Sequence, residues 1–310
     1  MGDLAVIGDL VRHAEAYDGV PRVLVDDELA VDLAASFVDL DLDTRLAVRG
    51  GVVVGWAQVW HPETVEHLDR AHLFGEVAPE HRGTGVGRAL LGWSVDRARE
   101  RLEATSRRLP RYLRVEALDW LEDRHRLYRR LGFEAVRWNE MLLRPLDDLP
   151  SVPVPVGVRI EPWPDDDAET LAVRNATFAD HWGSTTVPAE VWDEVVRGHG
   201  GRPDVSFVAA DATTGALVGI CLNQAYPEDE AVTGRRDAII ATLGTLREAR
   251  GRGVASALIS HSLAAFAAAG HSHAALDVDS ENPTGAFRLY RALGFEPDHR
   301  SITFQIALDD

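Results

Sequence analysis

Hydrophobic and polar positions follow one another in the same order in the two halves of the chain. Residues 44–60 and 205–224 each contain two β-rich runs around a glycine-containing turn, a pattern that predicts a β-hairpin. Short apolar runs follow at residues 71–79 and 238–246 and predict buried strands. Each half is therefore expected to contain a meander of three strands.

The pattern changes to helical spacing after the third strand. Residues 86–102 and 254–270 carry apolar positions three and four residues apart, and Gly270 is a suitable end for the second of these helices. A further strand and a short helix complete each half, at residues 111–118 and 121–133 in the first and at residues 274–280 and 282–295 in the second. The expected fold class is α+β, with a mixed central sheet flanked by helices in each half.

Prolines mark a boundary between the halves. Of the 15 prolines, several fall within one short stretch, namely Pro145, Pro150, Pro153, Pro155, Pro162 and Pro164. Such a stretch cannot be a regular helix or an interior strand. We therefore expect two domains, at residues 1–151 and 152–310.

Two short sequences recur in both halves, in the same order. The sequences RGTGVG at residues 82–87 and RGRGVA at residues 250–255 each lead into an apolar helix. They are followed by LYRRLGFE at residues 127–134 and LYRALGFE at residues 289–296. A repeat of about 150 residues is too long for a solenoid unit and indicates a domain duplication.

The composition narrows the possible functions. The chain has 310 residues and a formal net charge of −18, and its 32 basic residues are all arginine. Without lysine it has no P-loop lysine, Schiff-base lysine or lysine general base. An acidic protein lacks the basic surface expected of a nucleic-acid binder, but it suits a cationic substrate that bears an amine.

Other features exclude further classes. No apolar run approaches the roughly 20 residues of a membrane span, and the first residues lack the features of a secretory signal, so we expect a cytoplasmic protein with no membrane partner. The single cysteine, Cys221, ends an apolar strand and is expected to pack in the core. His271 and His273 lack a third ligand, so no metal site is expected.

The repeated glycine turns are suited to bind an anion, because backbone N–H groups and a helix N-terminus converge there. The spacing of Gly83, Gly85 and Gly87 is G-x-G-x-G, which differs from the dinucleotide fingerprint G-x-G-x-x-G. A Walker loop would require a lysine. The arginine that opens each turn would suit a pyrophosphate.

This combination of motifs resembles the GNAT superfamily of N-acetyltransferases. The motif R-G-x-G-[VI]-[GA] after a strand, followed by a helix, a strand and N…Y…LGF, is similar to the acetyl-CoA-binding signature of that family. The resemblance covers both halves and implies two tandem GNAT domains. Among tandem members the layout most resembles the mycothiol synthases, especially through LDVDSENPTGAFRLYRALGF at residues 276–295.

The resemblance implies where acetyl-CoA binds. The strand before each turn would hydrogen-bond the pantetheine arm and polarise the acetyl carbonyl, and the turn would hold the pyrophosphate. In the second half these residues are Leu243, Gly244, Thr245, Leu246, Arg250, Gly251, Arg252, Gly253, Val254, Ala255 and Asn282. In the first half they are Glu76, Val77, Ala78, Arg82, Gly83, Thr84, Gly85, Val86 and Gly87.

A tyrosine is suited to protonate the departing thiolate of CoA, because its ordinary pKa of about 10 lies just above that of a thiol. Tyr290 lies eight residues after Asn282, as is usual in the family. Tyr128 holds the same place in the first half, where Trp120 replaces the asparagine. We therefore expect Tyr290 to be catalytic and the second domain to carry the activity.

The general base is less evident from the sequence. Ile239 stands where the mycothiol synthases place a glutamate, and Asp237, two residues earlier on the same strand face, is the substitute we consider. Glu76 is a possible base in the first half. His181 and Trp182 lie where such folds place an acceptor-side loop, and they are candidates for substrate binding.

The expected function is an acetyl-CoA-dependent N-acetyltransferase that acts on the primary amine of a small molecule. Two alternatives stay open, namely a mycothiol synthase proper and a non-catalytic protein that binds or senses acyl-CoA. A relative that transfers aminoacyl groups from tRNA is disfavoured by the net charge of −18. The first domain would be a second cofactor-binding copy or a structural one.

Overall fold

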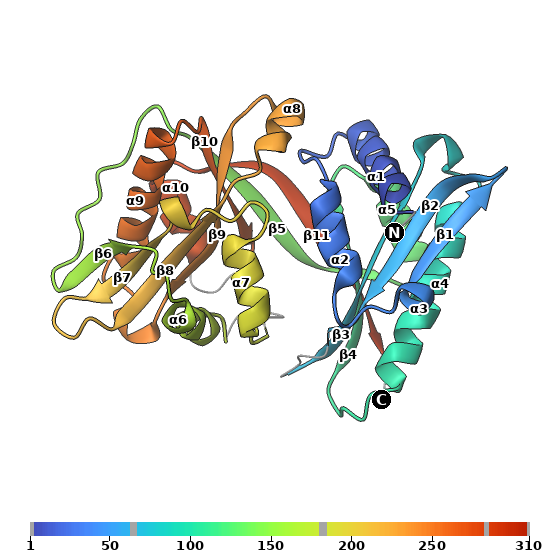
Figure 1. The fold of residues 1–310 in the computed structure, drawn as a ribbon, viewed down its shortest axis with the longest axis horizontal. Coiled ribbons are helices and arrows are strands. Elements are labelled where there is room, and N and C mark those ends of the chain that lie inside the picture. The colour runs from blue at the N-terminus through green and yellow to red at the C-terminus, as the bar shows by residue number, and fades with distance from the viewer. Residues whose placement is uncertain (1–2, 63–66, 180–184, 282–284, 309–310) are drawn as a thin grey trace. The chain divides into compact units, whose positions relative to one another are not determined.

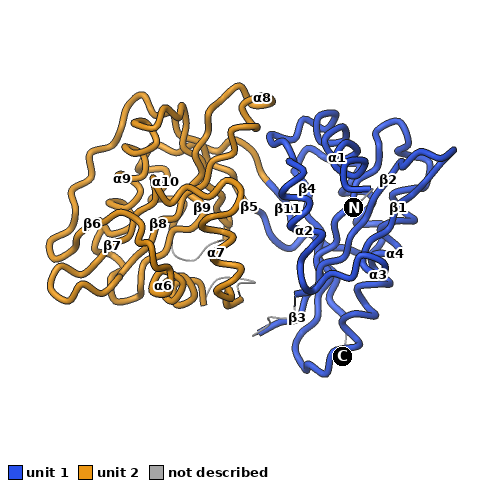
Figure 2. The backbone as a smooth tube through the Cα atoms, in the orientation of Figure 1, with its two compact units in different colours: residues 1–138, 301–310 blue, residues 139–300 orange. Residues whose placement is uncertain are grey.

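The computed structural model describes residues 3–62, 67–179, 185–281 and 285–308. They form two compact units (Figures 1 and 2). Unit 1 comprises Met1–Trp138 together with Ser301–Asp310, and unit 2 comprises Asn139–Arg300.

Unit 1 begins with helices and continues as a mixed sheet. Its elements are α1 (Leu4–Asp18), α2 (Asp26–Ala34), α3 (Leu40–Asp43), β1 (Thr44–Arg49), β2 (Val52–Trp60), β3 (Asp69–Val77), the 3₁₀ turn η1 (Pro79–His81), α4 (Val86–Glu103), β4 (Arg111–Leu118), α5 (Glu122–Arg130) and the start of β5 (Glu134–Pro145). The strand order is β1-β2-β3-β4-β11. β1, β2 and β3 pair antiparallel, whereas β3 and β4 pair parallel.

Unit 2 repeats this plan. Its elements are the end of β5, β6 (Val158–Pro162), α6 (Ala168–Phe178), α7 (Ala189–Arg197), η2 (Pro203–Val205), β7 (Phe207–Asp211), β8 (Leu217–Gln224), η3 (Pro227–Asp229), α8 (Glu230–Thr233), β9 (Asp237–Thr245), η4 (Arg247–Ala249), α9 (Val254–Ala268), β10 (His273–Asp279), α10 (Ala286–Ala292) and the start of β11 (Glu296–Leu308). The strand order is β5-β10-β9-β8-β7-β6. β9 and β10 are the parallel pair.

The elements form where the hydrophobic pattern predicts them. The hairpins β1–β2 and β7–β8 and the helix α9 lie within the expected ranges, and α4 extends one residue beyond its expected range, to Glu103. α9 buries Leu258, Leu263 and Phe266 in the core of unit 2, and α4 buries Val95 and Leu102 in the core of unit 1. Burial of such side chains contributes roughly 1.5–3 kcal/mol each and holds the helix on its sheet. The expected α+β class with two tandem domains is confirmed.

Strands β5 and β11 each contribute residues to both units. β5 begins in unit 1, but Asn139–Pro145 pairs with β10 of unit 2. β11 begins in unit 2, but Ser301–Leu308 pairs with β4 of unit 1. The compact units therefore divide the chain differently from the expected boundary at residues 151 and 152, because strand pairing places residues 139–151 in unit 2 and residues 301–308 in unit 1.

Candidate functional site

A wedge opens between two parallel strands in each unit. In unit 1 the pairing of β3 with β4 ends at His72 and Arg114, although both strands continue. In unit 2 the pairing of β9 with β10 ends at Ile239 and Ala275. Beyond these points the backbone edges of the two strands separate, so their N–H and C=O groups are available to an extended ligand.

The backbone alternation of the strand shows which N–H groups point into the wedge. The N–H of Leu246 donates to Val218 O at 2.9 Å, on the side of β8. Because backbone groups alternate along a strand, the N–H groups of Thr245 and Leu243 point to the opposite edge, toward the diverging β10. The N–H of Gly244 shares the direction of Leu246, so only half of the predicted strand residues offer an N–H group to the wedge.

The same alternation holds in unit 1. The N–H of Ala78 donates to Val54 O at 3.0 Å, on the side of β2. The N–H of Glu76 points the same way, and the N–H of Val77 points into the wedge between β3 and β4.

The glycine turns have the same conformation in both units. Gly83 and Gly251 have φ values of +72° and +73°, in the left-handed region that favours glycine. Gly85 (φ +94°) and Gly253 (φ +88°) are the N-cap residues of α4 and α9. The N–H groups of the first helical turn have no partner within the helix, and they include those of the predicted residues Val86, Gly87, Val254 and Ala255.

The arginine that opens each turn has a structural role that the sequence analysis missed. Arg82 Nε donates to Val77 O at 3.1 Å, and Arg250 Nε donates to Thr245 O at 3.1 Å. Each guanidinium thus ties its turn to the end of the preceding strand. Arg252 Nη2 donates to Val156 O at 3.4 Å, and the Thr84 hydroxyl donates to His81 O at 2.7 Å.

A cavity of about 600 Å³ occupies the wedge of unit 1. The glycines of the first turn and the end of β3 form one side, and α5 forms another. Its apolar lining includes Trp56, Leu73, Leu90, Leu91 and Leu127, and its polar lining includes Glu76, Arg82, Arg88, Arg124, Arg126 and Arg130. A cavity lined by both apolar side chains and several arginines matches a ligand that has an apolar arm and an anionic head.

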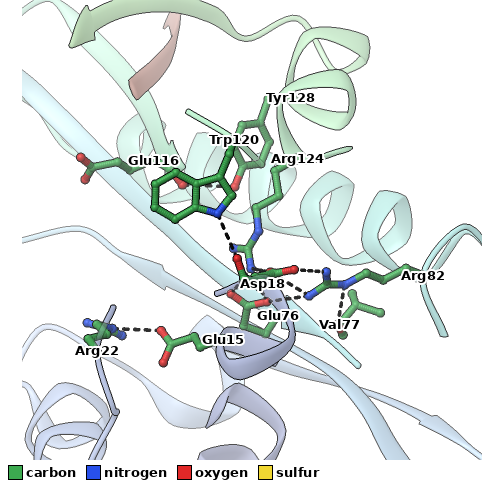
Figure 3. Close-up of polar contacts among 10 residues, drawn as sticks. All are labelled: Glu15, Asp18, Arg22, Glu76, Val77, Arg82, Glu116, Trp120, Arg124 and Tyr128. Atoms are coloured by element: carbon green, nitrogen blue, oxygen red, sulfur yellow. Dashed lines mark hydrogen bonds and ion pairs between the residues drawn. The ribbon is translucent and has the colours of Figure 1, made fainter. Parts of the chain in front are cut away.

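A network of four charged side chains lies at the cavity of unit 1 (Figure 3). Arg124 Nη2 lies 2.6 Å from Glu76 Oε1 and 2.8 Å from Asp18 Oδ2. Arg82 donates to both Asp18 carboxylate oxygens, at 2.5 and 3.0 Å. Burial raises the pKa of Glu76, and Arg124 opposes this effect. Burial also acts on Asp18, but the hydrogen bonds from Arg82 and Arg124 outweigh it and lower the pKa of Asp18.

The network includes Glu76, the carboxylate that the sequence analysis considered as a possible base in the first half. Glu76 is held by Arg124 instead of facing the cavity as a free group. Trp120, which replaces the asparagine of the second half, donates from Nε1 to Asp18 O at 2.9 Å (Figure 3). The Glu76 carboxylate is thus held in place by Arg124, which also binds Asp18 at the end of α1.

The two matching tyrosines differ in their hydrogen bonds. The Tyr128 hydroxyl donates to Glu116 O at 3.3 Å, and its ring packs edge-on against Phe304 with centroids 5.4 Å apart. The Tyr290 ring packs against Phe295 at 6.2 Å, and its hydroxyl has no hydrogen-bond partner among the described residues. Burial, followed by the negative charges of Cys221 and Asp277, raises the pKa of Tyr290 to about 12. Tyr290 is therefore protonated at neutral pH.

Asp237 lies apart from the wedge. It is the first residue of β9, its Cα partner His273 belongs to the paired stretch of β10, and Arg235 Nη2 lies 3.0 Å from its Oδ2. Asp237 therefore lies at the closed end of the wedge of unit 2. Tyr290 lies on α10, at the repeat position of Tyr128, which lines the cavity of unit 1. The predicted residues His181, Trp182 and Asn282 lie outside the described residues.

Cys221 and two further features of the chain concern function classes other than acetyl transfer. Cys221 is fully buried, its Sγ lies 3.3 Å from Ser262 Oγ, and burial raises its pKa to about 12, so it is an inert packing residue. Within the described ranges, no group of three or more His, Cys, Asp or Glu side chains could hold a metal ion. Across the same ranges, no helix is long and apolar enough to cross a membrane.

Family comparisons agree with this geometry. The model described as "Acetyltransferase (GNAT) domain" matches residues 42–135, and the model described as "Acetyltransferase (GNAT) family" matches residues 167–295. The mycothiol acetyltransferase of Frankia casuarinae is 33% identical and covers 83% of this chain and 73% of its own length. The mycothiol acetyltransferase of Rhodococcus erythropolis is 29% identical and covers 99% of this chain and 97% of its own length.

Solved structures show the same fold. The GCN5-related N-acetyltransferase of Sphaerobacter thermophilus is similar with a TM-score of 0.76 at 24% identity, and the match covers 99% of this chain and 93% of that one. A tandem GNAT protein from the clavulanic acid biosynthesis pathway is similar with a TM-score of 0.69 at 19% identity, over 99% and 97% of the two chains.

Proposed function

Because this chain belongs to the GNAT family of acetyltransferases, we propose that its second unit transfers the acetyl group of acetyl-CoA to the amine whose acetylation yields mycothiol. The observation that carries the proposal is the open wedge of unit 2, and it is supported by the glycine turn that follows β9 and by a tyrosine, Tyr290, that is protonated at neutral pH. The relatives named mycothiol acetyltransferase, which match over up to 99% of this chain, support the choice of acceptor over other small-molecule amines.

The residues of unit 2 fit acetyl-CoA. The N–H groups after Gly253 at the start of α9 would hold the pyrophosphate, because the helix N-terminus presents unpaired donors and a partial positive charge. The N–H groups of Leu243 and Thr245 would hold the pantetheine arm and polarise the thioester carbonyl. When bound, acetyl-CoA supplies the activated acetyl group, and the protein supplies alignment and proton transfer.

Tyr290 is the group that we assign to the leaving thiolate. With a pKa of about 12 it keeps its proton at neutral pH, and its hydroxyl, which has no hydrogen-bond partner among the described residues, is available to donate it. Positioned acids contribute roughly 10²–10⁴-fold to a rate. The hydroxyl of Tyr128 is already bonded to Glu116 O, which supports placing the reaction in unit 2.

For unit 1 we propose binding of CoA without transfer. Its cavity of about 600 Å³ and its glycine turn suit the same ligand. Glu76 is ion-paired with Arg124, and the hydroxyl of Tyr128 is bonded to Glu116 O, so both side chains are engaged by other groups of the protein. The acceptor-binding role of His181 and Trp182 stays a proposal for unit 2.

The experiment that tests the function is acetyl transfer by the purified full-length protein. Acetyl-CoA is offered together with des-acetyl mycothiol or with a panel of other primary amines, and the product is measured by mass spectrometry, since the proposed acceptor carries its own thiol. Acetylation of des-acetyl mycothiol in preference to the panel is expected. Acetylation of another amine would overturn the acceptor, and CoA binding with no turnover of any amine would favour the acyl-CoA-sensing alternative.

A further inference from the structure

One carboxylate lies at the open end of the unit 2 wedge and is not explained by the features described so far. Ala274, Leu276 and Val278 of β10 are buried in the core beneath α9. Asp277 lies between them in sequence and is exposed. Because side chains alternate along a strand, Asp277 projects from the sheet face opposite to α9.

The strand register places Asp277 beyond the last residue pair of β9 and β10, in the open part of the wedge. Ile239 and Ala275 form the last parallel pair, so their side chains share a face. Asp277 is two residues beyond Ala275 and is therefore on that same face, past the point where the strands separate. Ile239 stands where the mycothiol synthases, by resemblance, place a glutamate, so the neighbouring strand supplies a carboxylate on the same face.

An irregularity in β9 marks the same level of the wedge. β8 pairs Leu222 with Thr242 and Asn223 with Ile240, so Ala241 is an extra residue on β9. Ala241 is two residues beyond Ile239, as Asp277 is two residues beyond Ala275. The bulge and the carboxylate thus face each other across the opening, immediately before the Leu243 and Thr245 N–H groups assigned to the thioester.

Asp277 is also near the proposed acid. Its negative charge contributes to the raised pKa of Tyr290, after burial and Cys221. Tyr290 packs with the core on the α9 side of the sheet, whereas Asp277 projects from the other side. An acceptor that approaches from the Asp277 side would thus meet the thioester between a carboxylate and a phenol.

The corresponding position in unit 1 has a different environment. Ala71 and Ala238 are buried strand residues that pair with Leu113 and Ala274, and three residues beyond these partners lie Glu116 and Asp277. In unit 1 the Ser301 hydroxyl of β11 donates to Glu116 Oε1 at 2.6 Å. In unit 2 the residue opposite Asp277 on β5 is Met141.

We propose that Asp277 is the catalytic residue that binds the acceptor ammonium and removes its proton. The inference rests on the acetyl-transfer function proposed for unit 2. Asp277 accepts one proton from the ammonium, and the resulting amine nitrogen forms a bond to the acetyl carbon as the carbon–sulfur bond breaks. The thiolate takes the proton of Tyr290, and the second amine proton returns to the Tyr290 oxygen. The products are the amide and CoA, and the proton on Asp277 is released to water.

Asp237 is poorly placed for this role. Its Cα partner His273 is four residues before Asp277 on β10, which corresponds to about 13 Å at roughly 3.3 Å per residue. Its carboxylate is already paired with Arg235. Asp237→Asn is therefore the matched control for a carboxylate on the same face of the sheet.

The test compares Asp277→Asn, Asp277→Glu and Asp237→Asn in the full-length protein. Each variant is assayed with an acceptor that is mostly protonated at the assay pH and with a weakly basic amine, such as hydroxylamine, that is mostly neutral. Asp277→Asn should lower kcat/KM for the protonated acceptor by roughly 10²–10⁴-fold and affect the neutral amine much less. Asp277→Glu should restore part of the rate, and calorimetric affinity for CoA should not change.

The outcomes separate this inference from the function on which it rests. Equal loss with both amines, or an Asp277→Asn enzyme as fast as the parent, would overturn the role of Asp277, and so would a larger loss in Asp237→Asn. Absence of acetyl transfer by the unmodified protein to any amine would instead overturn the proposed function.

Discussion

Tyr128 and Tyr290 occupy the same position of the repeated LYR-x-LGF sequence, yet their hydroxyls have different partners. The replacement of the asparagine by Trp120 in the first half already favoured Tyr290 in the sequence, and the hydrogen bond from Tyr128 to Glu116 O adds a difference that the sequence could not show. Glu76 is a similar case. A glutamate on a cofactor strand resembles a base, but Arg124 and Asp18 come from distant segments of the chain, so no local pattern could show that Glu76 is paired.

Tyr290→Phe should lower kcat by roughly 10²–10⁴-fold and leave KM for acetyl-CoA nearly unchanged, because it removes only the proton donor. Since the pKa of Tyr290 is about 12, its ionisation should cause no loss of activity between pH 7 and about 10. Steady-state kinetics across this range provide the measurement. Tyr128→Phe is the matched control, and a loss of kcat there but not in Tyr290→Phe would move the reaction to unit 1.

Asp32 on α2 offers a test of stability at the same scale. Burial, followed by the charge of Glu28, raises its pKa to about 6. The folded state therefore favours the protonated form, and its stability falls as pH rises from about 4 through 6. Asp32→Asn should raise the free energy of unfolding at pH 7.5 by about 1–3 kcal/mol and have little effect at pH 4. Urea titrations at the two pH values measure this difference, and an equal effect at both would contradict it.

The two glycine turns show how much of an element its sequence determines. Positive φ at Gly83, Gly85, Gly251 and Gly253 was foreseeable from the motif, and so was the helix that follows each turn. The hydrogen bonds from Arg82 and Arg250 to carbonyl oxygens of the preceding strand could not be foreseen, because an arginine beside an anion-binding turn is equally suited to bind the anion. The bulge at Ala241 could not be predicted either, because the order of hydrophobic and polar residues along β9 does not reveal it.

Gly253→Asp and Gly253→Asn form a matched pair, since both side chains tolerate positive φ better than most and only aspartate adds a charge. Gly253→Asp should weaken CoA binding by unit 2 at least about tenfold, because the carboxylate opposes the anion at the start of α9. Gly253→Asn should bind more tightly than Gly253→Asp. Calorimetry on the full-length protein measures affinity and stoichiometry, and the same affinity in both variants would exclude an anion at this turn.

The exchange of β5 and β11 is a property of the whole molecule. The sequence analysis ended each half at a short helix and did not predict β5 or β11. A hydrophobic pattern also does not specify which sheet edge a strand joins. The proline-rich stretch indicated a boundary near residue 152, whereas pairing with β10 extends unit 2 back to Asn139.

This exchange predicts which fragments fold. The segment 139–300 carries every strand residue of unit 2, including the part of β5 that pairs with β10. The segment 152–310 is nearly as long but lacks β5 and leaves β10 as an exposed edge. The first should give a cooperative thermal transition, and the second should aggregate or unfold without cooperativity. Circular dichroism and size-exclusion chromatography compare them, and the opposite order of stability would argue against the exchange.

The pairing of β4 with Ser301–Leu308 also sets the order of events during synthesis on the ribosome. Residues 1–138 emerge first, but the sheet that they form stays incomplete until residues 301–308 have followed them. At roughly 5–20 residues per second, translation of the intervening segment takes on the order of 10–30 s. For that time the nascent chain exposes the edge of β4, where Arg111 and Arg114 place charge against premature pairing with other chains. The first unit to be translated is thus the last to be finished.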